Sequence, residues 1–334
     1  MKIMFCDMEF DYGVKRNGTN AIGGALQNAF QANGHEVEAL YYDDFLRLKQ
    51  PASELQRLLL SRAEELKPGL IFFPMFTNQF SYETLDKLKE RYCTVAWFGD
   101  DTWRFDNYSR LYAPHFTWCV TTDKFSIDKY KEHGQTNVIL SQWAAIDEDK
   151  PTEKFDGKYI YDVSFVGQFN HYRQWFIKML TKRGIKVDCF GKGWANGMID
   201  NAKMNEVFLR SKINLNIANS LCHDVRFLLS SPVVFARYFF SRKNMGQIKA
   251  RNFEIPYYGG FQMTDFFPGI EDYFSLGEEI ACYKDVDEAA MLIRYYLARE
   301  GIRRQMVDLA QQNARKKHGY INRIAEIMET IGTR

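Results

Sequence analysis

The sequence lacks several features that would identify a membrane, secreted or nucleic-acid-binding protein. No apolar run approaches the ~18 residues that a membrane-spanning helix needs. The first ten residues, MKIMFCDMEF, already include acidic residues and do not resemble a secretory signal peptide. Lys and Arg number 44 against 42 Asp and Glu, so the chain has no overall basic character of the kind that nucleic-acid binding favours. We therefore expect a cytoplasmic protein without a nucleic-acid partner, and peripheral contact with the inner face of the membrane stays open.

Metal-binding and dinucleotide-binding patterns are missing too. The six cysteines form no CxxC pair and the six histidines no HExxH pattern, so we expect reduced, buried thiols and no bound metal. No Gly-x-Gly-x-x-Gly is followed by an acidic residue about 20 positions later. The stretch from Gly18 to Gly24 comes nearest, but its spacing is wrong. A dinucleotide-dependent oxidoreductase is therefore an alternative that the spacing disfavours.

What the sequence does contain is a regular alternation of apolar runs with helical stretches. The chain has 334 residues, of which 46% are hydrophobic, enough for two cores. The expected strands lie at 2–6, 37–41, 70–74, 94–98, 118–121, 138–140, 162–166, 186–190, 213–217, 261–264 and 280–283, and the longer expected helices lie between or after them, the last at 286–299, 302–316 and 320–330. Such alternation predicts an α/β fold with two doubly wound lobes.

A polar stretch, DEDKPTEKFDGK, separates the two halves at residues 147–158. We place the domain boundary in it, because composition of this kind is typical of a linker. The expected domains are residues 1–150 and 151–316, followed by a C-terminal helical segment at 317–334.

Two glycine turns in the second half could hold a phosphate and a base. Gly167 follows a buried strand, and Arg173 lies in the first turn of the next helix, where backbone N–H groups and a cation would suit a diphosphate. Gly191, Lys192 and Gly193 follow the next strand, and Trp194 adds a flat apolar surface. An ordinary strand–turn–helix joint with a solvated arginine and a plain β-turn fit the same residues.

The segment from Lys249 to Phe266 carries the strongest chemical pattern. Lys249 and Arg251 precede Glu254, and a carboxylate is suited to accept hydrogen bonds from two ribose hydroxyls beside a cation-bound diphosphate. The alternative is a helix with an internal ion pair that ends at Gly259.

Carboxylates in the first half are candidates for a catalytic base. Asp100 and Asp101 follow a strand that reads as fully buried, so they should lie at its carboxyl end, although a helix cap explains them equally well. Asp7, after the first strand, fits a solvated loop better.

In its second half the chain resembles the CgeB-type, or spore maturation protein-like, glycosyltransferases of the GT-B superfamily. The family pattern has a strand-Gly start, a Y/F-G-x-G-W loop, an R-x-F-E-x-P/A-x-x-G-x-F-x-x-T-D block and an ending like H-T-Y-x-x-R. Here these elements read Val166-Gly167, Phe190–Trp194, Arg251–Asp265 and His318–Arg323. The first half is similar more loosely, through Trp97–Asp101 and Thr122-Asp123.

The resemblance implies a GT-B fold, with two Rossmann-like lobes facing a central cleft and a C-terminal helix that crosses back to the first lobe. It implies a hexosyltransferase-like enzyme of cell-surface glycan synthesis that needs no metal or cofactor. The donor would be a nucleotide-diphosphate sugar on the second lobe, and the acceptor, on the first, would be a glycan, lipid-linked glycan, protein or small molecule. The expected nucleotide-sugar-binding residues are Gly167, Gln168, His171, Gly191, Lys192, Gly193, Trp194, Arg251, Phe253, Glu254 and Thr264, and the catalytic candidates are Asp100, Asp101, Arg173 and Lys249.

Two departures from the family pattern matter. Retaining GT-B families have a second glutamate eight residues before the ribose glutamate, where this chain has Gly246, so the resemblance leaves retention and inversion both open. A catalytically degenerate nucleotide-sugar-binding protein is a separate alternative. Extra sequence also lies between Ile217 and Gly246. Its stretch FARYFFSRK, at 235–243, interleaves aromatic and basic residues and predicts either a membrane-contacting face or a buried helix with its basic ends in solvent.

Overall fold

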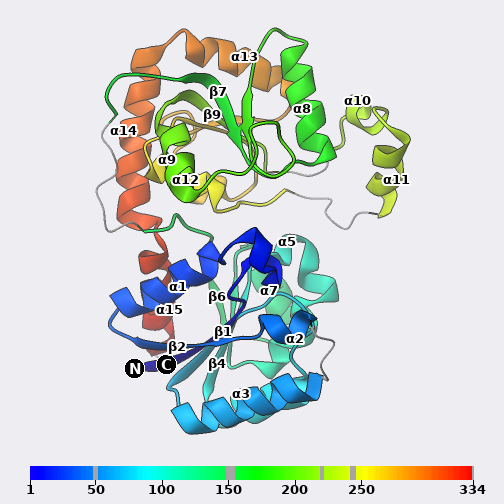
Figure 1. Cartoon of the computed structure of the whole chain (residues 1–334), viewed down its shortest axis with the longest axis vertical. Coiled ribbons are helices and arrows are strands. Elements are labelled where there is room, and N and C mark those ends of the chain that lie inside the picture. Colours follow the sequence, from blue (N-terminus) through cyan, green and yellow to red (C-terminus); the bar gives the residue numbers. More distant parts are fainter. Residues whose placement is uncertain (48–51, 148–154, 219–221, 241–245, 333–334) are drawn as a thin grey trace. The chain divides into compact units, whose positions relative to one another are not determined.

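The computed structural model describes residues 1–47, 52–147, 155–218, 222–240 and 246–332. Within it the chain forms two compact units, drawn in Figure 1. Unit 1 comprises Met1–Asp147 and Tyr320–Arg334, and unit 2 comprises Glu148–Gly319. Most of the expected linker at 147–158 lies outside the described residues.

Unit 1 is built on a six-stranded parallel sheet in the order β2-β1-β3-β4-β5-β6. The strands are β1 (Lys2–Asp7), β2 (Glu36–Tyr41), β3 (Leu70–Pro74), β4 (Cys93–Phe98), β5 (Trp118–Thr121) and β6 (Val138–Leu140). Its helices are α1 (Ala21–Ala32), α2 (Asp43–Arg47), α3 (Ala52–Leu66), α4 (Tyr82–Lys89), α5 (Asp101–Arg104), α6 (Ser109–Tyr112), α7 (Ser126–Glu132) and α15 (Tyr320–Gly332). Since helices cover both faces, the inner strands are continuous apolar runs rather than alternating ones.

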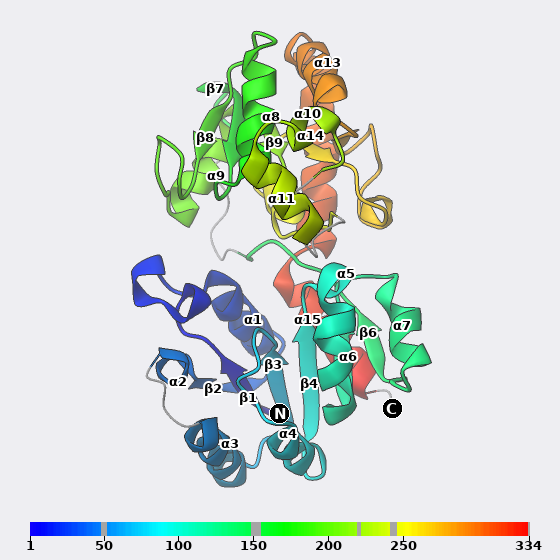
Figure 2. The ribbon, with the colours of Figure 1, turned by 90° about the vertical axis from the view of Figure 1, so that its right-hand side faces the viewer.

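Successive residues of each strand in unit 1 enter different cores, because side chains alternate across a sheet. Phe73 and the other strand residues on its face of the sheet pack against α3, α4 and α7. Phe72 lies on the opposite face, in a second core with α1 and α15. Tyr320, Ile324 and Ile327 of α15 are fully buried in that second core. The C-terminal helix is therefore an integral part of unit 1, and it lies beside α1 in Figures 1 and 2.

Unit 2 repeats the architecture on a five-stranded parallel sheet in the order β11-β10-β9-β7-β8. The strands are β7 (Tyr161–Val166), β8 (Asp188–Phe190), β9 (Ser211–Asn216), β10 (Gln262–Asp265) and β11 (Ala281–Tyr283). Its helices are α8 (His171–Thr181), α9 (Asn201–Leu209), α10 (Val225–Leu228), α11 (Pro232–Phe240), α12 (Arg251–Tyr257), α13 (Val286–Leu297) and α14 (Glu300–Lys317). Helices α8 and α13 cover one face of the sheet, and α9 and α12 the other.

The predicted α/β class with two Rossmann-like lobes is confirmed. All six cysteines are free, and Cys6, Cys119 and Cys189 are buried as expected, while the other three are half-buried. Among the described residues, no helix is long and apolar enough to cross a membrane. The cytoplasmic location stays a prediction.

Candidate active site

The two glycine turns of unit 2 are joined at the carboxyl ends of β7 and β8. Gly167 N donates to Phe190 O at 2.9 Å, and Trp194 Nε1 donates to Gly167 O at 2.9 Å. Gly191 has a φ of +122°, and a methyl group there would lie 2.4 Å from Gly167 O. Because no larger residue fits between the turns, glycine at 191 lets the two backbones form one continuous edge.

A second contact extends this edge. Phe169 N donates to Lys192 O at 2.9 Å, and a methyl group at Gly193 would lie 2.6 Å from Phe169 Cβ. Gln168, His171 and Lys192 are exposed here. The structure thus brings together most of the predicted phosphate-side and base-side residues on one rim of unit 2.

Arg173 ties this rim to the neighbouring strand β9. Helix α8 starts with an N-cap, since the Asn170 side chain accepts a hydrogen bond from Arg173 N at 2.8 Å. The guanidinium then donates from Nε to Ile217 O at 2.8 Å and from Nη1 to Gln168 O at 2.6 Å. Its Nη2 makes no hydrogen bond with any residue that the structure describes.

Charges of both signs surround Arg173. Burial lowers the pKa of Arg173 below its ordinary value, the Asp265 charge opposes that shift, and the positive charge of Arg251 adds to it. Two arginines therefore share one electrostatic environment at the carboxyl ends of β7 and β9. A bound phosphate would attract both guanidinium groups, and this attraction would offset part of the cost of burying Arg173.

Helix α12 carries Glu254 as an ion pair rather than as a solvated carboxylate. Arg251 Nη1 lies 2.7 Å from Glu254 Oε2, and Glu254 is 8% exposed. The Arg251 guanidinium also lies over the Phe208 ring, 5.2 Å from its centroid. The intrahelical pair that the sequence left as an alternative is thus present. It leaves Glu254 Oε1 without a hydrogen bond to any described residue.

Two predicted contact residues need correction. Phe253 and Thr264 are 0% exposed, so neither side chain can touch a nucleotide in this structure. The Thr264 hydroxyl accepts from Asn252 Nδ2 at 3.1 Å, and Asn252 Oδ1 accepts from Lys249 N at 3.0 Å. Asn252 therefore fixes the start of α12 against β10. Sequence reasoning missed it, because an asparagine between Arg251 and Phe253 in a partly charged segment gives no signal of burial.

The two carboxylates that follow β4 have separate environments. Asp101 is 1% exposed and accepts a hydrogen bond from Tyr130 at 2.8 Å, and burial raises its pKa to about 6. As a catalytic candidate Asp101 is corrected to a core residue, since an acceptor hydroxyl cannot reach it. Asp100, just before α5, is half-buried and stays accessible.

Asp7, expected in a solvated loop, is in fact 2% exposed at the end of β1. It accepts from Met8 N at 2.7 Å and from Asn20 Nδ2 at 3.0 Å. Burial raises its pKa to about 7. The Asn20 cap of α1 and the close Gly23 enclose this carboxyl, a contact between chain segments that the local sequence does not reveal.

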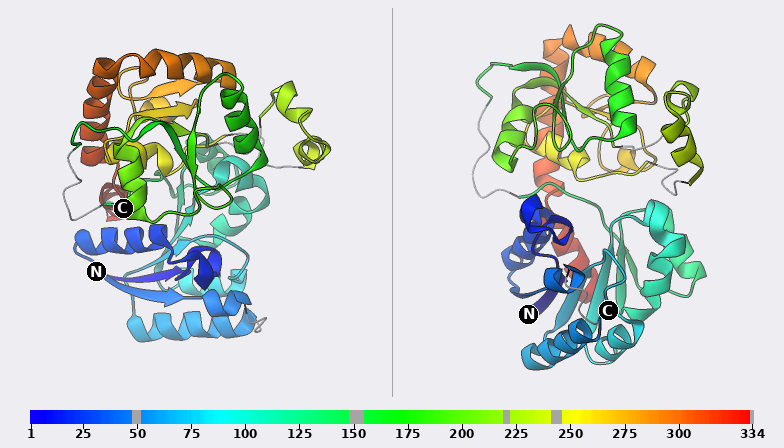
Figure 3. Two further views of the ribbon diagram at one scale, coloured as in Figure 1. Left: turned by 45° about the horizontal axis from the view of Figure 1, so that its top comes forward. Right: turned by 45° about the vertical axis from the view of Figure 1, so that its right-hand side comes forward.

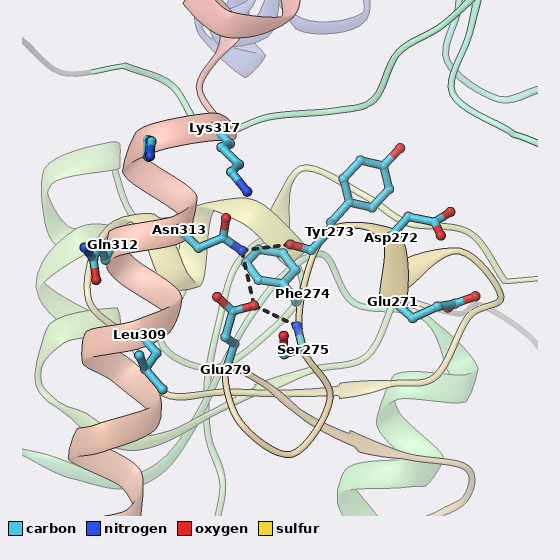
Figure 4. A pocket seen from close by; sticks show the side chains of 11 residues that line it. Glu271, Asp272, Tyr273, Phe274, Ser275, Glu279, Leu309, Gln312, Asn313 and Lys317 are labelled. Atoms are coloured by element: carbon cyan, nitrogen blue, oxygen red, sulfur yellow. Dashed lines mark hydrogen bonds between the residues drawn. The ribbon is translucent and has the colours of Figure 1, made fainter.

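A pocket of about 460 Å³ in unit 2 contains none of the predicted residues. In Figure 4, Asn313 on α14 points towards the loop before β11, donating to Tyr273 O at 2.9 Å and Glu279 Oε2 at 3.2 Å. The pocket backs onto α12, because the Phe253 ring packs against Tyr273 and Phe274. The lining residues are Glu271, Asp272, Tyr273, Phe274, Ser275, Glu279, Leu309, Gln312, Asn313, Lys316 and Lys317.

Residues 173–329, somewhat less than half of the chain, match the family model described as glycosyl transferase-like. The fold of the whole chain matches that of GT-B glycosyltransferase structures. No curated protein sequence matches the chain.

Solved structures with the same fold cover nearly the whole chain. Sucrose-phosphate synthase from Thermosynechococcus elongatus is similar with a TM-score of 0.66 at 8% identity, covering 100% of this chain and 99% of the other. Anabaena HepE in complex with UDP is similar with a TM-score of 0.65 at 11% identity, covering 100% of both chains. A glycosyltransferase from Rickettsia africae has a TM-score of 0.63 at 9% identity, with 100% and 99% coverage. At such identities the likeness establishes the fold.

Proposed function

We propose that this chain is a CgeB-type glycosyltransferase that moves a hexose from a nucleotide-diphosphate sugar to an acceptor hydroxyl. The position of the Arg173 guanidinium is the observation that best supports the proposal. Its guanidinium lies between the carboxyl ends of β7 and β9, next to the charge of Arg251 and beside the rim formed by Gly167 and Gly191. A diphosphate is the ligand that this combination of cations and bare backbone suits best.

In the proposed reaction the acceptor oxygen bonds to the anomeric carbon while the bond from that carbon to the diphosphate breaks. The electron pair of the broken bond leaves with the nucleoside diphosphate. Arg173, Arg251 and Lys249 would stabilise the charge that grows on the leaving group. One preorganised donor of this kind lowers a barrier by about 2.7–4 kcal/mol.

Donor recognition is assigned to α12 and to the second glycine turn. Glu254 Oε1 would accept from the ribose while Oε2 stays with Arg251, and Trp194 with the Gly191–Gly193 turn would line the base pocket. We propose that metal is not required, because these cations supply the charge. In the part of the chain that the structure describes, no group of three or more His, Cys, Asp or Glu side chains could hold a metal ion.

The acceptor is assigned to the carboxyl edge of the unit 1 sheet. There Asp100 is half-buried, whereas Asp101 is 1% exposed, so Asp100 is the candidate to take the proton of an acceptor hydroxyl. This assignment makes Asp100 the base if the configuration at the anomeric carbon is inverted.

Thermal shift measurements with UDP, GDP, dTDP, CMP and NAD, each with EDTA or Mg²⁺, test donor binding. UDP is the first choice because HepE was solved with UDP, with UDP-glucose, and with UDP and glucose. We expect a nucleoside diphosphate to raise the melting temperature in EDTA, and Arg173→Gln and Glu254→Ala to remove that shift. Stabilisation by NAD alone would overturn the proposal.

Nucleotide release then separates an enzyme from a binding protein. With the stabilising nucleotide identified, its hexose conjugates are incubated with the protein, and the free nucleoside diphosphate is measured over time. We expect slow release by hydrolysis that Asp100→Asn or Arg173→Gln reduces. Binding without release from any conjugate would favour the degenerate nucleotide-sugar-binding alternative.

A further inference from the structure

Helices α10 and α11 form an arm that leaves the sheet of unit 2. They lie between β9 and α12 in sequence, within the extra segment noted above. Figures 1 and 3 show both helices at the outer margin of unit 2, next to α8 and away from the strands. No catalytic or donor-binding residue proposed above lies on this arm.

The inner side of the arm is anchored to unit 2. Phe227 is 1% exposed, and its ring packs against those of Tyr172 and Trp175 on α8, at centroid distances of 5.2 and 5.5 Å. Val234 is 3% exposed. These contacts hold the arm in place.

The outer side of the arm is apolar and open to solvent. Phe239 and Phe240 are 67% and 86% exposed, and Leu229 is 74% exposed. We call this the aromatic arm surface, made of Val225, Leu229, Val233, Phe235, Phe239 and Phe240, each of them exposed. The buried-helix interpretation of residues 235–240 is therefore wrong, and residues 241–243 of that stretch lie outside the described residues. Clustered exposed phenylalanines of this kind mark an interaction site.

The charge of this segment is of one sign. From Val225 to Gln247 the sequence has no Asp or Glu, whereas Arg226, Arg237, Arg242 and Lys243 are basic. Arg226 is already paired with Asp224 and Asp287, at 2.6 and 2.8 Å. The excess of basic over acidic residues in this part of the sequence would attract an anionic surface and repel a second copy of the same segment.

We propose that the aromatic arm surface docks on an anionic lipid bilayer. Phenylalanine and leucine side chains enter the interface between headgroups and acyl chains, while nearby basic residues are attracted to anionic headgroups. A helix of nine residues is only ~14 Å long. Its exposed side does not supply the ~800 Å² per partner that a stable dimer needs, whereas shallow insertion needs only a few apolar side chains. This inference does not rest on the proposed transferase activity.

Flotation with lipid vesicles tests the proposal. The full chain is mixed with vesicles of phosphatidylcholine alone, or of phosphatidylcholine with about 30% phosphatidylglycerol. Each mixture is tested at low and at high salt. We expect the protein to float with the anionic vesicles, less with neutral ones, and less at high salt. Phe239→Ser with Phe240→Ser should weaken binding by about tenfold or more, because two inserted rings are lost.

Control variants keep the result interpretable. Phe125→Ser changes an exposed phenylalanine of unit 1 (54% exposed) and should bind vesicles like the parent. Leu229→Ser is a second arm variant, to be used if the double substitution lowers the melting temperature. Equal flotation of parent and arm variants, or flotation with neither vesicle, would refute the proposal. A concentration-dependent dimer in analytical ultracentrifugation that the double substitution abolishes would instead assign the surface to a second copy of this chain.

Discussion

Arg251 and Glu254 face each other across one turn of α12, with Arg251 Nη1 2.7 Å from Glu254 Oε2. In the proposed site the arginine of this pair would bind phosphate and the glutamate would bind the ribose. It also means that neither residue can be changed without altering the charge next to the other.

Glu254→Gln is expected to weaken binding of the stabilising nucleotide by about 10–100-fold, since a hydrogen bond to a charged group contributes ~1.5–3 kcal/mol. Isothermal titration calorimetry measures the effect. The matched control is Glu206→Gln on α9, which removes an i,i+3 ion pair to Lys203 at 2.8 Å. Nucleotide affinity should not change in that control. Unchanged affinity in Glu254→Gln would show that the Arg251 pair is structural and that the ribose binds elsewhere.

Gly191→Ala is expected to abolish nucleotide binding and to lower the melting temperature of unit 2. A methyl group 2.4 Å from Gly167 O would force the two turns apart, in addition to the strain of a positive φ. Gly197→Ala separates the two effects, because Gly197 has a φ of +67° but nothing within 4 Å of an added methyl group. We expect the control to cost about 1 kcal/mol of stability and to leave binding intact. Equal behaviour of the two variants in differential scanning calorimetry and nucleotide titration would contradict a joined rim.

The sheet of unit 1 was predictable from sequence because its inner strands are largely apolar runs. β3 and β5 have the bounds that their apolar runs predict. Burial of single polar groups was not predictable in this way. Asp101 lies in the core because Tyr130, 29 residues later, donates to it, and Asp7 because the start of α1 closes over it. Such contacts depend on tertiary packing, which local sequence does not encode.

Helix α12 shows the same limit within the site. Pro256 near its end and the charged residues at its start fitted both a ribose-binding segment and an ordinary capped helix. In the folded chain Phe253 of α12 and Thr264 of β10 are completely buried, whereas Glu254 keeps 8% of its surface exposed. The sequence therefore indicated which segment forms the site, but not which of its side chains reach a ligand.

The stability of unit 1 is expected to depend on pH through Asp7. Its pKa is raised from 3.8 to about 7 by burial, so between about pH 4 and pH 7 the folded state holds a proton that the unfolded state has lost. This group therefore stabilises unit 1 at low pH, and the contribution is lost as the pH rises through 7. Each unit of pKa difference corresponds to about 1.4 kcal/mol, so the change amounts to a few kcal/mol.

Urea unfolding at pH 5, 6, 7 and 8 measures the Asp7 contribution. The difference in unfolding free energy between parent and Asp7→Asn should shift in favour of the variant as the pH rises from 5 to 7 and level off towards pH 8. This comparison cancels the carboxylates that act in the opposite sense, such as Asp224, whose pKa its Arg226 partner lowers. A constant difference for Asp7→Asn would mean that its carboxyl is already ionised at pH 5.

Ile324→Ala is expected to destabilise unit 1 by about 2–5 kcal/mol, because Ile324 is fully buried on α15 in the core that contains Phe5, Phe30 and Phe72. Ile321→Ala, one turn earlier on the same helix and 38% exposed, should cost much less. Trp97, whose ring centroid lies 6.4 Å from that of Tyr320, reports the loss by its fluorescence during unfolding. Nucleotide binding to unit 2 should persist in Ile324→Ala at temperatures where unit 1 stays folded. If Ile324→Ala lowered the unfolding transition of unit 2 and left that of unit 1 unchanged, the assignment of the C-terminal helix to unit 1 would be refuted.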